Sequence, residues 1–388
     1  MTEAQNIQPV TIHGLTLANF RNAESAQYTF GTGLIFITGN NGAGKTTILE
    51  AIGLTSFLRS FRFALDREMI RFGSSFYRIE TGFSVGTAKH RMSIAFGRNP
   101  EDPKAALVKK YMFDGRANTR AAEIIGRIPT VVLSPDDLRI IAGDHAERRR
   151  FLDLLLSMLY PAYFAALQQY QRALKMRSQA LKSRPDEGML AAIDRELASA
   201  GVQILEKRRQ FIPEFTAPFN ENVARISAGK DAWKIDYLGD TRGVNTLEDY
   251  MAMLRDRRAN DLRLRQTTAG IHRDRIFFLS DGSLRELQAA GDATALPDIR
   301  TVGSQGQKRT AALALKMAQF NYMQAKLGLR PVLLIDDVLN ELDLGRRASF
   351  VDFLGNVGQV FFTTTDLVGM QDFLKNLHQT TPVQNIEL

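Results

Sequence analysis

The segment from Gly39 to Thr46 could bind a phosphate group. It reads Gly-Asn-Asn-Gly-Ala-Gly-Lys-Thr and fits the pattern G-x-x-x-x-G-K-[ST] at every fixed position. Small residues let backbone N–H groups surround a phosphate, and a following helix adds the partial positive charge of its N-terminus. Lys45 would reach the β- and γ-phosphates, and the Thr46 hydroxyl would ligate Mg²⁺. The expected nucleotide contacts are Gly39, Asn40, Asn41, Gly42, Ala43, Gly44, Lys45, Thr46 and Thr47.

Two acids, Asp336 and Asp337, end an apolar run that begins at Pro331. Hard Mg²⁺ needs oxygen ligands, and a carboxylate at the end of a buried strand supplies one beside a phosphate loop. We therefore expect Asp336 as a metal ligand and Asp337 as the group that orients or deprotonates the attacking water. Taken alone, a strand that ends in acids is common. The sequence has no Asn-Lys-x-Asp motif for guanine recognition, so ATP is the expected nucleotide.

A third segment, Val302 to Arg309, precedes a helix expected over Thr310 to Ala325. Ser304 and Gly306 at a helix start would present a hydroxyl and N–H groups, which is a second anion site. Taken alone, the segment is better explained as an ordinary capped helix. The order along the chain is that of ABC-type ATPase heads, in which the signature segment of one subunit completes the nucleotide site of the other. Ser304, Gly306 and Gln307 are therefore expected to contact nucleotide bound to a second copy.

The elements around these segments have the required character. The run Leu34 to Thr38 is typical of a buried strand, and residues 47–52 have apolar side chains at helical spacing. Strand, glycine loop and helix is the context that the phosphate-loop motif needs. Further strands are expected at Val10–Phe20, Ser25–Phe30, Phe76–Val85, His90–Phe96, Tyr111–Asp114 and Thr130–Leu133.

The middle of the chain is predicted to be helical. From Glu147 to Ile226 it is rich in Leu, Ala, Gln, Arg and Lys, with breaks expected at Pro161, Pro213 and Pro218. A strand at Trp233–Leu238 and a basic helix at Leu247–Leu264 follow. We predict a core assembled from residues 1–145 and 300–388, and a largely helical lobe at residues 146–299.

Composition limits the classes of protein. The chain has 388 residues, a formal net charge of +8 and a pI of about 9.6, a balance that favours nucleic acid or another anionic partner. It contains no cysteine, which excludes disulfides and thiolate metal sites. No apolar run approaches the length of a membrane span, and the polar start lacks the pattern of a signal peptide. A cytoplasmic protein without a membrane partner is expected.

In combination, these motifs resemble the RecF family of bacterial recombination-repair ATPases, which are related to SMC proteins. Beyond the phosphate loop, the matching segments are Ala18–Asn22, Leu49–Ile52, Arg59–Arg62, Leu133–Leu138, Arg148–Asp153, Thr268–Asp274, Ser304–Gln307, Leu334–Asp343 and Thr363–Leu367. The resemblance implies an α/β fold, an ABC-type P-loop ATPase head with a mixed β-sheet lobe and an inserted helical lobe. Two positions depart from the family pattern Gly-Pro-His-Arg-Asp-Asp, which here has Ile271 and Arg275.

The resemblance also implies a function. ATP would close a homodimer around two nucleotides, and slow, DNA-stimulated hydrolysis would reopen it, so that the protein acts as a switch. It would bind single- and double-stranded DNA at gap junctions and, with RecO and RecR, help to load RecA. Arg21 and Asn22 are candidate nucleotide contacts, although a surface turn explains them equally well. Thr365 or Asp366 falls where ABC heads keep a γ-phosphate sensor.

Basic residues of the helical lobe are the candidates for DNA contact. Such contacts go mainly to phosphates and carry little sequence information. For any single arginine, a solvated helix face is the favoured explanation. The candidates are Arg148, Arg149, Arg150, Lys175, Arg177, Arg255, Arg257 and Arg258.

Two rival functions fit less well, and a third stays open. An ABC transporter subunit would not need so long a helical middle segment. A phosphate-loop nuclease of the overcoming-lysogenization type would need a nuclease domain, for which too few residues follow Asp343. A scaffold that binds ATP without hydrolysing it stays open.

Overall fold

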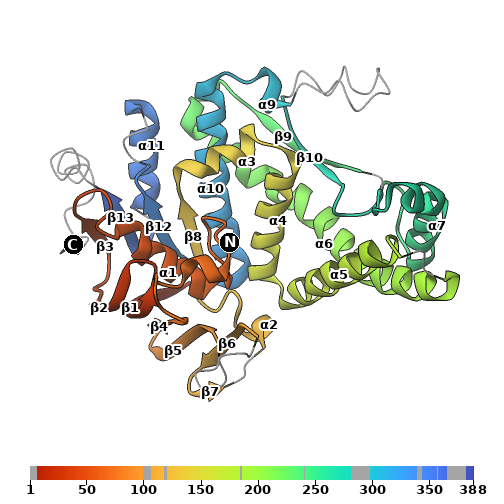
Figure 1. The fold of residues 1–388 in the computed structure, drawn as a ribbon. Helices are drawn as coiled ribbons and strands as arrows, with labels where there is room; N and C mark the ends of the chain where they lie inside the picture. Colours follow the sequence, from red (N-terminus) through yellow and green to blue (C-terminus); the bar gives the residue numbers. More distant parts are fainter. Residues whose placement is uncertain are drawn as a thin grey trace. The chain divides into compact units, whose positions relative to one another are not determined.

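The structure, a computed structural model, describes residues 7–98, 106–117, 120–183, 186–239, 241–280, 298–338, 343–355, 357–364 and 382–388. The chain forms two compact units, the first of residues 1–137 and 316–388 and the second of residues 138–315 (Figure 1). Composition placed these boundaries at residues 145 and 300. The difference matters for Ser304, which lies in the second unit rather than with the phosphate loop.

A parallel sheet forms the centre of the first unit. Its strand order is β14-β3-β13-β12-β8, and every pairing is parallel. The strands are β3 (Leu34–Thr38), β8 (Thr130–Leu133), β12 (Val332–Asp336), β13 (Val360–Thr364) and β14 (Val383–Glu387). Every residue of β3, β8 and β13 is buried, as the unbroken apolar runs of the sequence require. Because carboxyl ends of parallel strands meet at one edge, the loop after β3 lies near the ends of β12 and β13.

An antiparallel sheet completes the strands of the first unit. It contains β1 (Gln8–Phe20), β2 (Ala23–Thr29), β4 (Phe76–Val85), β5 (Ala88–Gly97), β6 (Val108–Phe113) and β7 (Arg116–Ala117), with β11 (Leu329–Arg330) parallel to β1. Buried and exposed residues alternate along β4, because one face of the sheet packs inward. The strands predicted in the first third of the chain are confirmed, with ends shifted by a few residues.

Helix α1 (Lys45–Phe57) follows the phosphate loop and is buried from Ile48 onward. The other helices of this unit are short: η1 (Asp66–Met69), α2 (Ala121–Ile124), η2 (Pro135–Asp137) and α11 (Leu344–Leu354). Helix α10 (Gln305–Leu327) starts in the second unit and continues into the first. It begins five residues earlier than the sequence predicted, at the Ser-Gln-Gly-Gln segment itself.

The second unit is mainly helical. It contains α3 (Leu138–Ala142), α4 (His145–Leu159), α5 (Pro161–Ala180), α6 (Glu187–Ser227), α7 (Leu247–Leu264) and α9 (Ile299–Val302). Strand β9 (Trp233–Leu238) pairs antiparallel with β10 (Arg275–Ser280). The predicted break at Pro161 is confirmed, because α4 ends at Leu159 and proline occupies the first position of α5.

The breaks predicted at Pro213 and Pro218 are wrong. Both prolines lie inside α6, which runs unbroken for 41 residues. An interior proline removes a backbone hydrogen bond and costs about 3 kcal/mol. Here the same stretch buries three phenylalanines, Phe211, Phe215 and Phe219, each of which contributes about 1.5–3 kcal/mol on burial. Tertiary packing therefore outweighs the local preference to end the helix. Among the described residues, no helix is both long and apolar enough to cross a bilayer.

Candidate nucleotide site

The N-terminus of α1 is left open toward the phosphate loop. Its N-cap is Gly44, so no side chain caps the helix, and its first turn contains no acid. Gly44 has a φ of 106°, and a Cβ there would lie 3.1 Å from the side-chain amide nitrogen of Asn22; both facts favour glycine. By contrast, α4 and α6 begin with aspartates that accept backbone N–H groups. The first N–H groups and the positive end of α1 thus remain available to an anion.

Lys45 lies at the mouth of this loop. Its Nζ donates to the carbonyl oxygens of Gly39 at 2.7 Å and Asn40 at 2.9 Å. The loop is held further by the Ala43 N–H, which donates to the Asn40 carbonyl. The ammonium is therefore already placed over the loop, in the position from which it would contact a phosphate.

Three side chains meet at the edge of the parallel sheet. The hydroxyl of Thr46 donates to Asp336 Oδ1 at 2.9 Å, and that of Thr363 donates to the same oxygen at 2.8 Å. Thr46 lies in the first turn of α1, Asp336 ends β12, and Thr363 lies in β13, which pairs with β12. The sequence predicted Thr46 and Asp336 but not Thr363. A polar residue near the end of a strand was the available signal, and only the strand order places it next to Asp336.

Asp337 follows Asp336 on the exposed side of the strand end. Its φ is 52°, the left-handed region that side chains other than those of Gly, Asn and Asp rarely occupy. Asp336 and Asp337 both line the cavity described below. The backbone therefore turns sharply after β12 and presents two successive carboxylates to one space.

A cavity of about 830 Å³ joins these groups, a volume within the range of small-ligand sites. From the phosphate-loop region its lining includes Asn41, Gly42, Gly44, Lys45, Thr46 and Thr47. The cavity is also lined by Arg21, Asn22 and Thr363. For Arg21 and Asn22 the sequence allowed either a nucleotide contact or a surface turn. The remaining lining comes from the loop after α1, at residues Arg62, Glu68, Ile70, Arg71 and Phe72.

Arg21 is held by an ion pair beneath the cavity. Its guanidinium contacts both carboxylate oxygens of Glu50, at 2.6 and 2.8 Å, and Glu50 is completely buried on α1. Ser60 donates a further hydrogen bond to the same carboxylate. This bidentate pair fixes the turn between β1 and β2 against α1, the helix that follows the phosphate loop.

The residues present suit a magnesium ion bound together with phosphate. Thr46 and Asp336 supply one hydroxyl and one carboxylate oxygen within hydrogen-bond distance of each other. Within the described part of the chain, no group of three or more His, Asp or Glu residues gathers as a metal site. Mg²⁺ commonly takes only one or two protein ligands and completes its shell with water and phosphate oxygens, so this pair is sufficient.

Ser304 forms a capping box at the start of α10. Its hydroxyl accepts the Gln307 N–H at 3.2 Å, and the Gln307 side chain accepts the Ser304 N–H at 2.9 Å. Gln307 also donates to Asp231 at 2.9 Å. Gly306 lies in the first turn of α10. The ordinary capped helix is thus realised, with Ser304 exposed to solvent.

Part of the predicted site lies outside the described residues. This applies to the candidate sensors Thr365 and Asp366, and to Asn340 and Glu341 of the segment after Asp337. Asp343 is described and caps α11 by accepting the Arg346 N–H.

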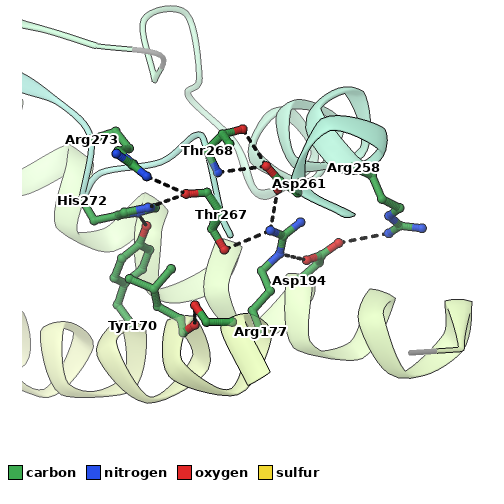
Figure 2. Close-up of polar contacts among 11 residues, drawn as sticks. Tyr170, Arg177, Asp194, Arg258, Asp261, Thr267, Thr268, His272 and Arg273 are labelled. Carbon is green, nitrogen blue, oxygen red and sulfur yellow. Dashed lines mark hydrogen bonds and ion pairs between the residues drawn. The ribbon is translucent and has the colours of Figure 1, made fainter. Parts of the chain in front are cut away.

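Two of the predicted DNA contacts need correction. Arg148 and Arg177 have 1% and 0% of their surface exposed, so neither presents its charge to a ligand. Arg148 forms an ion pair with Asp298 and donates to backbone carbonyls, including that of Ile276 at 2.7 Å. Figure 2 shows Arg177 between Asp194 and Asp261, at 2.6 Å from each. A buried charge needs such partners, and the sequence contained no sign that these two arginines would be buried.

The other candidates differ in their surroundings. Arg258 bonds to Asp194 at 3.0 Å on the solvent side of the same cluster (Figure 2). Arg149 donates to the Asp274 carbonyl, and Arg150 pairs with Glu147. Lys175 on α5 and both Arg255 and Arg257 on α7 are exposed. The exposed three are therefore the ones that suit contact with phosphates.

Comparison with known proteins places the chain in a family. The model of the RecF/RecN/SMC N terminal domain matches residues 11–386. The chain is 39% identical over 364 residues to "DNA replication and repair protein RecF" of Leptospira interrogans serovar Lai, covering 94% of each. It is 34% identical over 379 residues to the protein of the same name from Agathobacter rectalis, covering 97% of each. The chain belongs to the RecF family.

Solved structures of this family share the fold. The chain is similar to "the recombination mediator protein RecF-ATPrS in RecFOR pathway", with a TM-score of 0.80, 28% identity, and coverage of 97% of this chain and 96% of that one. It is equally similar to the protein described as "RecF-ATP", with a TM-score of 0.81, 28% identity, and coverage of 92% and 93%. The predicted fold class, an α/β ATPase head with parallel and antiparallel sheets and a helical insert, is confirmed.

Proposed function

We propose that this RecF-family chain is a Mg²⁺-dependent ATPase head that dimerises on ATP and thereby controls binding to DNA. The observation that carries the proposal is the open N-terminus of α1, with Lys45 over the loop and the Thr46–Asp336 pair beside it. A polyphosphate and its metal ion match these groups in charge and chemistry. The family structures described with ATP and ATPrS support extension of ATP binding to this chain.

Each side chain has a distinct task in this proposal. Thr46 and Asp336 hold Mg²⁺, which neutralises charge on the β- and γ-phosphate oxygens when it is bound. Lys45 moves from the Gly39 carbonyl to the phosphates. Asp337 orients the attacking water. Its side chain is shorter than the Glu of ABC heads in general and holds that water less closely, so hydrolysis is slow and the ATP state persists.

A second copy completes the site. Ser304, Gly306 and Gln307 at the start of α10 are exposed or half-exposed, and they contact the γ-phosphate bound to the partner. ATP then stabilises the dimer because it touches both chains, and hydrolysis removes that link. ATP thus shifts the equilibrium from monomer to dimer. The free energy of that shift cannot exceed the difference in the free energy of ATP binding between dimer and monomer.

DNA is the proposed partner of the closed dimer. Phosphates are contacted by Lys175, Arg255 and Arg257. The affinity for DNA therefore falls steeply with salt: the logarithm of the association constant decreases with the logarithm of the salt concentration with a slope of about 0.9 for each phosphate neutralised. The family structures are described as a recombination mediator protein in the RecFOR pathway. On that basis the chain acts with RecO and RecR. From the family resemblance we further propose that it acts at gapped DNA and helps to load RecA.

Sedimentation velocity tests the central claim. The chain is expected to be a monomer alone and a dimer with ATP, Mg²⁺ and a gapped duplex. Ser304→Asp keeps a good N-cap but places a negative charge against the partner's γ-phosphate, so it should bind ATP and stay monomeric. Ser304→Asn is the matched control, since it keeps the cap without the charge. A wild-type chain that stays monomeric with saturating ATP and gapped duplex would refute the shared site.

Phosphate release separates an ATPase from a scaffold. The wild type should release phosphate slowly and faster with DNA, and Lys45→Arg should release none. Phosphate release as fast as the turnover of a metabolic kinase would contradict the proposed slow ATPase switch. Equal rates of release for wild type and Lys45→Arg would show that the hydrolysis does not take place at this site.

A further inference from the structure

Phe72 is an aromatic side chain at the rim of the nucleotide cavity. It lines that cavity, yet 99% of its surface is exposed. Its neighbours in the lining are Arg62, Glu68 and Arg71, so the ring stands in charged surroundings. A fully exposed phenylalanine lacks the favourable free energy that burial of its ring would contribute. A ligand that covers the ring would recover part of that free energy.

The backbone that carries Phe72 is firmly held. The Arg71 N–H donates to the Asn19 carbonyl and the Arg21 N–H to the Met69 carbonyl, both at 2.8 Å. Phe20 and Ile70 form an antiparallel bridge between the same two segments. Because Arg21 is tied in turn to Glu50 on α1, the position of residue 72 is fixed relative to the phosphate loop.

A tight turn directs the ring outward. The Ser74 N–H donates to the Arg71 carbonyl at 3.0 Å, and Gly73 has a φ of 82°. Glycine at the third position with positive φ is the signature of a type II turn, which places Phe72 at the second position, on the corner. The Phe72 ring is thus in place before any ligand arrives, which lowers the entropic cost of binding.

The chemistry of the two parts of the lining differs. Lys45, Thr46 and Asp336 match phosphates and a metal ion. Phe72, on the loop after α1, offers an apolar aromatic face. A nucleotide combines an anionic chain with a flat aromatic base, and aromatic side chains bind bases by stacking.

We propose that Phe72 stacks on the base of the nucleotide whose phosphates bind at Lys45. The proposal rests on the proposed ATP-binding function and names the residue that recognises the base. Stacking reads the face of a base and not its edge, so adenine and guanine nucleotides gain from Phe72 alike. Phe72 is a binding residue and takes no part in the chemical step.

Binding of ATP and of inorganic tripolyphosphate, each with Mg²⁺, tests this assignment in the full chain. Phe72→Ala should weaken ATP and GTP about tenfold and leave tripolyphosphate unchanged, because that ligand has no base. Leu65→Ala is the matched control: Leu65 lies on the same loop with 53% of its surface exposed, and it is not among the described residues that line the cavity. It should bind all three ligands as the wild type does.

A fluorescent variant gives a direct signal. The chain has one tryptophan, Trp233, which is buried in the second unit. Phe72→Trp adds an exposed indole at the cavity, and ADP or ATP should quench its emission while tripolyphosphate should not. The wild type, with Trp233 alone, reports any indirect effect. Equal signals from ADP and tripolyphosphate in Phe72→Trp would overturn the proposal.

Lys45→Ala separates this proposal from the function on which it rests. That variant should lose ATP and tripolyphosphate together. If Lys45→Ala weakens ATP but Phe72→Ala does not, the base-stacking assignment is wrong and the phosphate site stands. If Lys45→Ala leaves ATP binding intact, the proposed function itself fails. Loss of ATP-dependent dimerisation in Phe72→Ala with unchanged ATP affinity would make Phe72 a contact between copies and would also overturn the assignment.

Discussion

The nucleotide cavity and the ionic cluster around Arg177 are both rich in charge, but they use it in opposite ways. In the cavity, Lys45 donates to the carbonyl oxygens of Gly39 and Asn40, and Asp337 is exposed. In the cluster, the Arg177 side chain and both of its carboxylate partners are completely buried. The cavity keeps its charged groups available to a ligand, whereas the cluster pairs them with opposite charges inside the protein.

The cluster joins three helices to one loop. Arg177 from α5 bonds to Asp194 of α6, Asp261 of α7 and the Thr267 hydroxyl, and Asp261 accepts two further hydrogen bonds from Thr268 (Figure 2). Burial alone lowers the pKa of Arg177, but the bonds and charges of Asp194 and Asp261 outweigh it and raise that pKa. The guanidinium therefore stays charged and holds the loop that follows α7.

Removal of Arg177 should have the largest effect on stability. Arg177→Ala removes the cation that buried Asp194 and Asp261 share, although Asp194 keeps its bond to Arg258, and this costs about 3–5 kcal/mol of the free energy of unfolding. Urea titration followed by circular dichroism measures this. Lys45→Ala, the matched change in the cavity, should alter that free energy by less than about 0.5 kcal/mol while it abolishes nucleotide binding. Equal destabilisation by the two variants would erase the contrast between cluster and cavity.

Acidic pH should lower the free energy of unfolding because of His272, which contacts the same loop. Its Nε2–H donates to the Thr267 carbonyl at 3.2 Å, its Nδ1 accepts the Tyr170 hydroxyl at 2.8 Å, and burial lowers its pKa to about 4. The folded state keeps His272 neutral, whereas the unfolded chain takes up a proton below about pH 6.5. The free energy of unfolding should therefore fall between pH 6.5 and 4, by up to about 3 kcal/mol.

A variant isolates this effect. Burial raises the pKa of Asp274, whose contribution has the opposite sign and is lost as the pH rises. His272→Asn removes only the histidine, so the difference between wild type and variant across pH 4–6.5 reports His272. Parallel stability curves for the two proteins would exclude it as the titrating group.

Two arginines on α7 test the same comparison with the smallest expected changes in stability. Arg258 bonds to buried Asp194, so Arg258→Ala should cost about 1–2 kcal/mol of stability. Arg255 is exposed, and Arg255→Ala should change stability by less than about 0.5 kcal/mol. Its effect should appear in DNA binding, as a weaker affinity and a salt slope reduced by about 1. Fluorescence anisotropy with a gapped duplex at several salt concentrations measures both; an unchanged slope would remove Arg255 from the DNA contacts.

One departure from the family pattern has a structural consequence. Where the pattern has proline, Ile271 donates its backbone N–H to the Tyr250 hydroxyl at 3.2 Å, a bond that proline cannot form. Ile271 itself is buried. Isoleucine at this position therefore permits a hydrogen bond in the loop that the Arg177 cluster holds.

The sequence by itself determined the phosphate loop, its strand and helix, and the carboxylates after β12. These features depend on local patterns, since glycine spacing, apolar runs and helical periodicity act within about fifteen residues. The position of Thr363 beside Asp336 depended on the order of parallel strands. Burial of Arg148 and Arg177, which look like any exposed arginine in the sequence, depended on acids far along the chain.

The tertiary structure also decided the continuity of α6 through two prolines and the placement of Phe72 at the cavity. Packing of Phe211, Phe215 and Phe219 outweighs a local helix-breaking preference. The bridge between residues 20 and 70 brings the loop after α1 to the phosphate site. In each case the deciding energy comes from contacts between distant residues, which a linear pattern does not contain.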